Sequence, residues 1–190
     1  LRAVSISFLK SKTFFIFSII AGAIDVSPVI FFEISATIKL DYLMLIKKST
    51  KIITKSAEET QMTAEFLAKE ILETPSSKTA FVLALRGNLG GGKTCFLQGF
   101  ARGLGIKEKI LSPTFILMRR CNNFYHFDCY RIQKSKDILD LGFKKIFKNP
   151  KNIVAIEWAE KMKELLPKKR IDVKFEYLKR DRRKIIINNF

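Results

Sequence analysis

Residues 85–96, LRGNLGGGKTCF, are the part of this sequence best suited to chemistry, because four glycines are followed by a lysine and a threonine. The segment from Gly87 to Thr94 fits the pattern G-x-x-x-x-G-K-[ST], whose glycines let backbone N–H groups surround a phosphate. Average residue frequencies give roughly a 0.7% chance of such a match in this chain. Lys93 would bridge the β- and γ-phosphates of a nucleotide, and the Thr94 hydroxyl would bind Mg²⁺. The predicted phosphate-binding residues are Gly87, Gly90, Gly91, Gly92, Lys93 and Thr94.

A carboxylate near the metal is the second requirement of such a site, and it usually ends a neighbouring buried strand. Glu157 ends the apolar run IVAIE, and Asp128 lies in the stretch NFYHFDCY at 123–130. Either acid has the chemistry to orient an attacking water. The candidate catalytic residues are therefore Lys93, Asp128 and Glu157, and the choice between the two acids stays open.

The elements that must position these residues alternate between helices and strands. The run 56–72 opens with Ser56 and Glu59 at the spacing of a reciprocal helix cap, and Met62 and Phe66 fall on one side of the predicted helix. Continuous apolar runs at 79–87 and 152–158 predict two buried strands, one leading into the glycine-rich loop and one ending near Glu157. Further strands are expected at 113–118 and 123–130, further helices at 93–104, 136–142 and 159–166, and a terminal hairpin at 170–178 and 182–188.

This order of elements predicts an α/β fold like that of P-loop NTPases, with a largely parallel central sheet flanked by helices and a C-terminal β-hairpin. The length of 190 residues suits one core. The formal net charge of +17 is suited to a polyanionic partner, and equally to a solvated basic surface. Three cysteines without a Cys-x-x-Cys pair are typical of a reducing compartment, so we expect a cytoplasmic protein.

The N-terminal residues differ from the rest of the chain in their pattern of apolar and basic residues. The segment 13–24, TFFIFSIIAGAI, is apolar and follows basic residues, as in a signal peptide. Asp25 and Pro28 leave it shorter than the ~20 residues of a spanning helix. We expect residues 1–43 to lie outside the native domain through an over-extended gene start, with a signal or membrane anchor as the alternative. The P-loop domain is then 44–190, and no stable membrane association is expected.

The motifs together resemble a known protein family. The segments LRGNLGGGKT, SPTF (112–115), HFDCYR (126–131), LGF (141–143) and IEW (156–158) occur in the order and approximate spacing of the TsaE (YjeE) family. The resemblance covers about residues 52–178. The combination is far more specific than the glycine-rich loop alone.

The resemblance implies an ATPase with low intrinsic activity that is required for threonylcarbamoyl-adenosine modification of tRNA. It implies ATP or ADP and Mg²⁺ as cofactors and TsaB and TsaD proteins as partners. The chain would act as a motor or reset element, with tRNA as an indirect partner. Thr94 and Glu157 match the family's Mg²⁺ positions, and Asp128 matches an acid required for activity. Thr114 matches a switch-like segment beside the γ-phosphate.

Three positions depart from the family's common pattern: Asn88 replaces Asp, Gly91 replaces Ala and Cys95 replaces Thr. These positions contribute mainly backbone or packing, so Cys95 is kept among the cofactor-binding candidates. Two other functions remain open on the residues alone. One is a small-molecule P-loop kinase, and the other is a phosphate- or nucleic-acid-binding protein that does not hydrolyse nucleotide.

Overall fold

The computed structural model describes residues 49–74, 77–108, 110, 117–132, 136–139, 141–179 and 181–189. All of them belong to one compact unit of the chain, Leu45–Phe190. The expected N-terminal extension, residues 1–43, lies outside the described residues, and the domain boundary at 44 stays a prediction. No helix among the described residues is long and apolar enough to cross a membrane.

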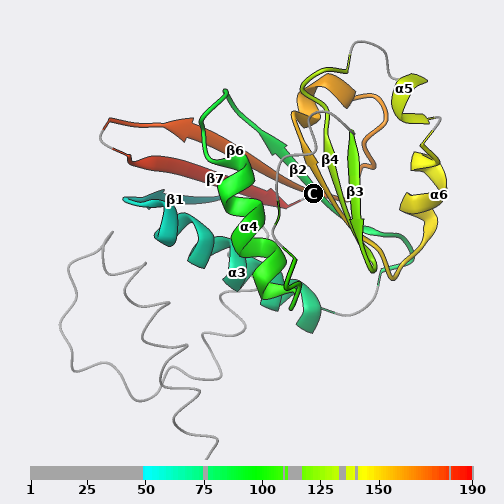
Figure 1. Ribbon diagram of the computed structural model, residues 1–190, viewed down its shortest axis with the longest axis horizontal. Coiled ribbons are helices and arrows are strands. Elements are labelled where there is room, and N and C mark those ends of the chain that lie inside the picture. Colours follow the sequence, from blue (N-terminus) through cyan, green and yellow to red (C-terminus); the bar gives the residue numbers. More distant parts are fainter. Residues whose placement is uncertain are drawn as a thin grey trace, which may run out of the picture. The chain divides into compact units, whose positions relative to one another are not determined.

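Seven strands of the described residues form one mixed sheet (Figure 1). The inner strands β6, β2, β5 and β4 run parallel to one another, and the outer pairings, β1 with β7, β7 with β6, and β4 with β3, are antiparallel. The α/β class, the parallel centre of the sheet and the C-terminal hairpin are therefore confirmed. In sheet order the strands are β1 (Thr50–Thr54), β7 (Arg183–Asn189), β6 (Ile171–Tyr177), β2 (Phe81–Arg86), β5 (Ile153–Glu157), β4 (Phe124–Asp128) and β3 (Met118–Cys121).

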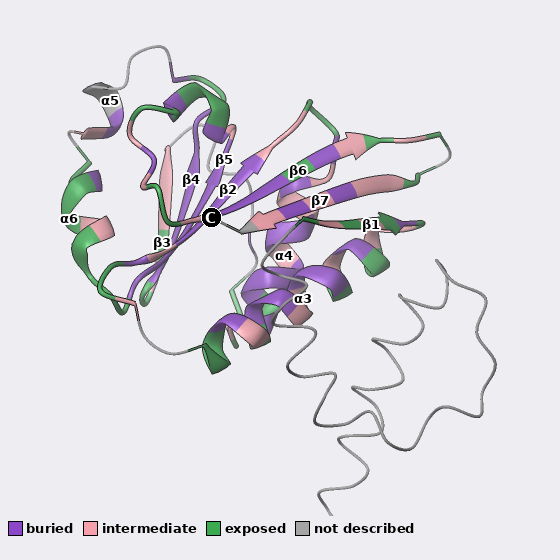
Figure 2. Ribbon diagram, turned by 180° about the vertical axis from the view of Figure 1, so that it is seen from behind, coloured by how far each residue is buried: buried purple, intermediate pink, exposed green. Residues whose placement is uncertain are grey.

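Helices cover both faces of this sheet. On one face lie α3 (Ala57–Glu73) and α4 (Lys93–Gly103), and on the other lie α5 (Lys136–Leu139), α6 (Phe143–Lys148) and the 3₁₀ helix η2 (Ala159–Met162). Side chains alternate along a strand, so Leu83 and Leu85 of β2 join the first core and Val82 and Ala84 the second. Figure 2 shows the inner strands buried between these layers.

Helix α3 begins as its sequence predicts, with one difference in the half of the cap that Glu59 supplies. The Ser56 hydroxyl accepts the N–H of Glu59 at 3.2 Å, and the Glu59 carboxylate accepts the N–H of Lys55, at 2.7 Å, one residue before the cap. The buried side of α3 is not centred on Met62, which is 41% exposed; the side facing α4 and the sheet includes Ala64 and Ala68.

Helix α4 lies unusually close to α3 because glycines face the contact. A Cβ atom added to Gly99 would lie 2.0 Å from the carbonyl oxygen of Gln61, and one added to Gly103 would lie 2.5 Å from that of Glu65. No other residue type fits at this separation. The close contact packs α4 against α3, and the first turn of α4 carries Lys93 and Thr94.

Several predicted elements differ from those observed. Strand β1 and helix α6 were not predicted, and the expected helix at 159–166 is only the short 3₁₀ helix η2. In the expected strand 113–118, residues 113–116 lie outside the described residues, and β3 begins at Met118. The expected helix at 136–142 is observed as α5, which ends at Leu139. The hairpin turn between β6 and β7 contains Asp181 with a φ of 57°.

Candidate phosphate-binding site

The glycine-rich loop joins β2 to α4 at the carboxyl end of the parallel strands. Gly87 has a φ of 136°, and a Cβ atom there would lie 2.5 Å from the carbonyl oxygen of Phe175. Gly92, with a φ of 100°, directly precedes α4. Both positions need glycine, for close approach to β6 and for a left-handed backbone respectively.

Lys93 folds back over its own loop. Its Nζ atom donates hydrogen bonds to the carbonyl oxygens of Gly87 at 2.7 Å and Asn88 at 2.9 Å, and it lies 3.9 Å from the ring centroid of Trp158. The residue is only 4% exposed. Burial lowers the pKa of this lysine, while the charges of Glu157, Glu160 and Asp128 act in the opposite direction. The loop thus holds a buried amine that a phosphate anion would stabilise in its charged form.

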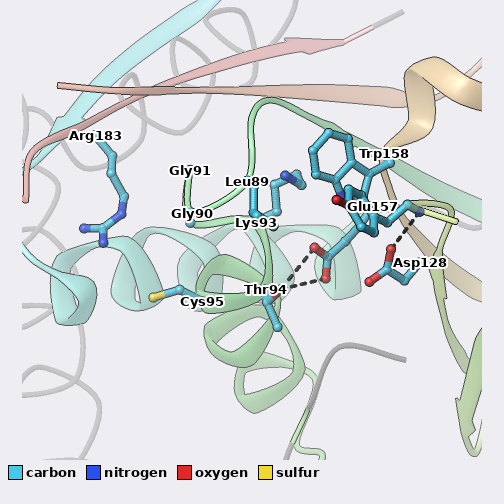
Figure 3. Close-up of a pocket in the computed structure, with 12 residues that line it drawn as sticks. Leu89, Gly90, Gly91, Lys93, Thr94, Cys95, Asp128, Glu157, Trp158 and Arg183 are labelled. Atoms are coloured by element: carbon cyan, nitrogen blue, oxygen red, sulfur yellow. Dashed lines mark hydrogen bonds between the residues drawn. The ribbon is translucent and has the colours of Figure 1, made fainter. Parts of the chain in front are cut away.

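Thr94, the next residue, connects α4 to the end of β5. Its hydroxyl lies 3.0 Å from both carboxylate oxygens of Glu157, and the dashed lines in Figure 3 mark these contacts. The Nε2 atom of His126 lies 2.9 Å from Oε1 of the same carboxylate. A carboxylate oxygen accepts hydrogen bonds, so the hydrogen in this contact is assigned to Nε2. The buried Nδ1 atom has no partner among the described residues. Glu157 is therefore held from two sides.

Asp128 brings a second carboxylate to the same edge of the sheet. It ends β4 and is the register partner of Glu157 in the parallel β4–β5 pair. Its Oδ1 atom accepts the backbone N–H of Tyr130 at 2.9 Å, which fixes the carboxylate at the strand end. Both acids that the sequence singled out are nearly fully buried, and they lie in one site.

These residues surround an open cleft with a volume of about 460 Å³, which is within the range of small-molecule sites. Its lining combines the predicted loop and acids with four further residues. The predicted ones are Gly90, Gly91, Gly92, Lys93, Thr94, Cys95, Asp128 and Glu157, and the additional ones are Leu89, Tyr130, Trp158 and Arg183.

The two other predicted site residues are Gly87 and Thr114. Gly87 does not line the cleft but supplies the carbonyl oxygen that accepts from Lys93. Thr114 and its neighbours at 111–116 lie outside the described residues, so their role stays a prediction. Trp158 lines the cleft and also contacts the second core, with its ring centroid 5.0 Å from that of Tyr130.

The oxygen atoms at the Thr94–Glu157 contact are suited to Mg²⁺. This ion prefers oxygen ligands and is commonly bound by one or two protein groups together with phosphate and water. No cluster of three or more His, Cys, Asp or Glu side chains arranged for a metal occurs in the described part of the chain. A hydroxyl and one carboxylate beside the phosphate loop are what a nucleotide-bound Mg²⁺ requires.

Comparison with known proteins gives a consistent result. The sequence profile of the family described as "Threonylcarbamoyl adenosine biosynthesis protein TsaE" matches residues 54–185. The tRNA threonylcarbamoyladenosine biosynthesis protein TsaE of Bacillus subtilis is 35% identical over 142 residues, covering 73% of this chain and 84% of the relative. The protein of the same name from Treponema pallidum is 32% identical over 140 residues, covering 72% of this chain and 98% of the relative.

A solved structure extends the similarity to the fold. The crystal structure of YdiB from Bacillus subtilis superposes with a TM-score of 0.61 at 32% sequence identity. The match covers 75% of this chain and 86% of that chain. Sequence and fold thus point to the same group of proteins.

Proposed function

Since this chain belongs to the TsaE family of threonylcarbamoyl adenosine biosynthesis proteins, we propose that it binds ATP with Mg²⁺ and hydrolyses it slowly in the threonylcarbamoyl-adenosine modification of tRNA. One observation carries the nucleotide part of the proposal. The buried Lys93 amine, the Thr94 hydroxyl and the Glu157 carboxylate meet at one glycine-rich loop. This combination supplies a cation for phosphate and oxygen ligands for its metal.

Lys93 exchanges partners when nucleotide binds. In the structure its Nζ atom is bonded to the carbonyl oxygens of Gly87 and Asn88. A phosphate oxygen is a stronger, charged acceptor, so the amine would turn from these carbonyls to the β- and γ-phosphates. Backbone N–H groups of the loop and the first turn of α4 would bind the remaining phosphate oxygens.

Thr94 and Glu157 would hold the metal, and bound Mg²⁺ would neutralise charge on the β- and γ-phosphates. His126 keeps the Glu157 carboxylate turned toward Thr94 through its Nε2–H. With Glu157 so engaged, we assign to Asp128, on the neighbouring strand, the orientation of the attacking water. The assignment rests on the Thr94 and His126 contacts of Glu157 and on the place of Asp128 at the end of the neighbouring strand.

Slow intrinsic turnover is consistent with the charges at the γ-phosphate end. Among the described residues lining the cleft, Arg183 is the only arginine, and it lies beyond Gly90 and Gly91 on the side away from Glu157 (Figure 3). No arginine of the described cleft therefore stands where one would stabilise charge during γ-phosphoryl transfer. We propose that TsaB and TsaD proteins complete the site in the cytoplasm, and that tRNA is reached through that complex.

The test is ATP turnover by the full chain, alone and with purified TsaB and TsaD proteins. We expect low turnover alone, stimulation by the partners, and loss of both with Lys93→Ala. Glu157→Ala distinguishes the ATPase from a protein that only holds phosphate, because the ATPase would lose its function with this metal ligand and the phosphate-holding protein would keep it. Tight ATP binding without turnover in either condition would contradict the proposed ATPase, and a phosphorylated small-molecule acceptor would favour the kinase.

A further inference from the structure

Arg183 is a cleft residue whose position the proposed hydrolysis does not explain. It begins β7, where it pairs with Thr54 of β1 and Tyr177 of β6. Its side chain crosses directly over the phosphate loop: a Cβ atom added to Gly92 would lie 2.8 Å from Cδ and 2.9 Å from Nε of Arg183. A residue of the C-terminal hairpin thus touches the loop that precedes α4.

The guanidinium is only partly satisfied by the protein. One Nη atom donates to the carbonyl oxygen of Asp181 at 2.8 Å. Among the described residues, the buried Nε–H has no hydrogen-bond partner and no carboxylate forms an ion pair with this side chain. A guanidinium has five N–H donors in a fixed fork, and an unpaired buried donor is costly. An anionic ligand would satisfy these groups.

The two ends of the cleft differ in charge. Thr94, Glu157 and Asp128 mark one end, which is acidic and suited to the metal and to the terminal phosphates. Arg183 and Cys95 mark the other end (Figure 3). Burial raises the pKa of the Cys95 thiol, and the nearby charge of Arg183 acts to lower it, which is consistent with the two groups being neighbours.

A nucleotide has only one orientation that fits this polarity. Its terminal phosphates belong with Lys93, Thr94 and Glu157, so the α-phosphate and the nucleoside must extend toward Cys95 and Arg183. We propose that Arg183 binds the α-phosphate of the nucleotide and thereby selects nucleoside phosphates over inorganic pyrophosphate. This inference rests on the ATP binding proposed above.

The proposal separates Arg183 from the residues that act on the γ-phosphate. An interaction with the α-phosphate is the same before and during transfer of the γ-phosphate, so it contributes to affinity and not to the rate at saturation. It also ties the nucleotide to the hairpin, since β7 carries the guanidinium.

The experiment compares ligands on the full chain with Arg183→Ala, Arg183→Lys and the matched control Arg182→Ala, an exposed neighbouring arginine. Calorimetry gives the Kd for ADP and ATP with Mg²⁺, and competition against ADP gives that for pyrophosphate. We expect Arg183→Ala to weaken the binding of ADP and ATP by about tenfold or more, which is the usual loss for a charge-assisted hydrogen bond. Pyrophosphate affinity and kcat at saturating ATP should change by no more than about twofold, because neither depends on the α-phosphate contact.

Three results would overturn the inference: unchanged ADP affinity, an equal loss for pyrophosphate, or a fall in kcat with KM unchanged. Arg183→Lys keeps the charge without the forked donors, so its affinity for ADP and ATP should fall less than that of Arg183→Ala. If circular dichroism shows that the alanine variant does not fold, the lysine variant provides the same comparison of nucleotide with pyrophosphate. Arg182→Ala should leave every value within about twofold of the original. A wild-type chain that binds neither ADP nor ATP would instead contradict the proposed function itself.

Discussion

Lys93 and Trp158 are in direct contact at the cleft. The amine lies over the indole ring at 3.9 Å, and the tryptophan itself has a left-handed backbone, with a φ of 57°. Such a conformation is uncommon for a bulky residue, and it is maintained only where the surroundings hold it. Here it places the indole beside the phosphate loop.

The coupling makes tryptophan emission a reporter of nucleotide binding. Trp158 is the single tryptophan of the chain, so any change in emission comes from this residue. When ATP or ADP with Mg²⁺ draws the Lys93 amine toward phosphate, the charge over the ring moves, and we expect a saturable change in fluorescence on titration.

Lys93→Ala is the control for this titration, because it removes the charge and leaves the indole. Its emission should differ from that of the original chain without ligand and should respond little to nucleotide. An equal response of the variant at equal ligand occupancy would show that the amine is not the source of the signal.

At this scale the sequence identifies residues that are close along the chain or carry a recognisable pattern. The loop, Glu157 and Asp128 are found in this way, since each directly follows an apolar run. Arg183 lies in another strand pair, and its exposed neighbour Arg182 has the same residue type. Only the position of the Arg183 side chain, beside Gly92 and in the cleft, shows which arginine faces the loop.

Among the elements, β2 and β5 are predictable because strands covered on both faces appear as unbroken apolar runs. Strand β1, TKIIT, is short and polar at its ends, and its partner strand β7 is far away along the chain. Helix α6, FKKIFK, is too short for a clear period. In 159–166 the sequence has helix-forming residues, but only one 3₁₀ turn forms as the chain packs Ala159 and Met162 into the second core.

The contact between α3 and α4 gives a prediction about stability. Gly99→Ala should lower the free energy of unfolding by about 3 kcal/mol or more, since the new methyl group meets the backbone of Gln61 and one helix must move. Chemical denaturation of the full chain measures this effect.

Gly142→Ala serves as the matched control. Its added Cβ atom would have open space, but Gly142 has a φ of 75°, so only backbone strain of about 1 kcal/mol is expected. If the two variants were equally destabilised, the close helix contact would not be the cause.

At the scale of the whole molecule, the formal net charge of +17 predicts weak association with tRNA even without partner proteins. Such binding releases counterions, so we expect the affinity to fall by about tenfold or more between roughly 50 and 200 mM salt. Filter binding or fluorescence anisotropy with labelled tRNA measures it. Affinity that is independent of salt would contradict an electrostatic origin.

The pairing of β1 with β7 also sets a constraint on the order in which the chain can fold during translation. Among the described strands β1 pairs only with β7, and its register joins Thr50 to Ile187. A ribosome releases β1 early, but its partner emerges only when nearly all of the sequence shown here has been made. Until then β1 has no sheet to join, and Arg183 has not reached the phosphate loop. The pairing of β1 with β7 and the placement of Arg183 at the cleft therefore both occur late in translation, when β7 is made.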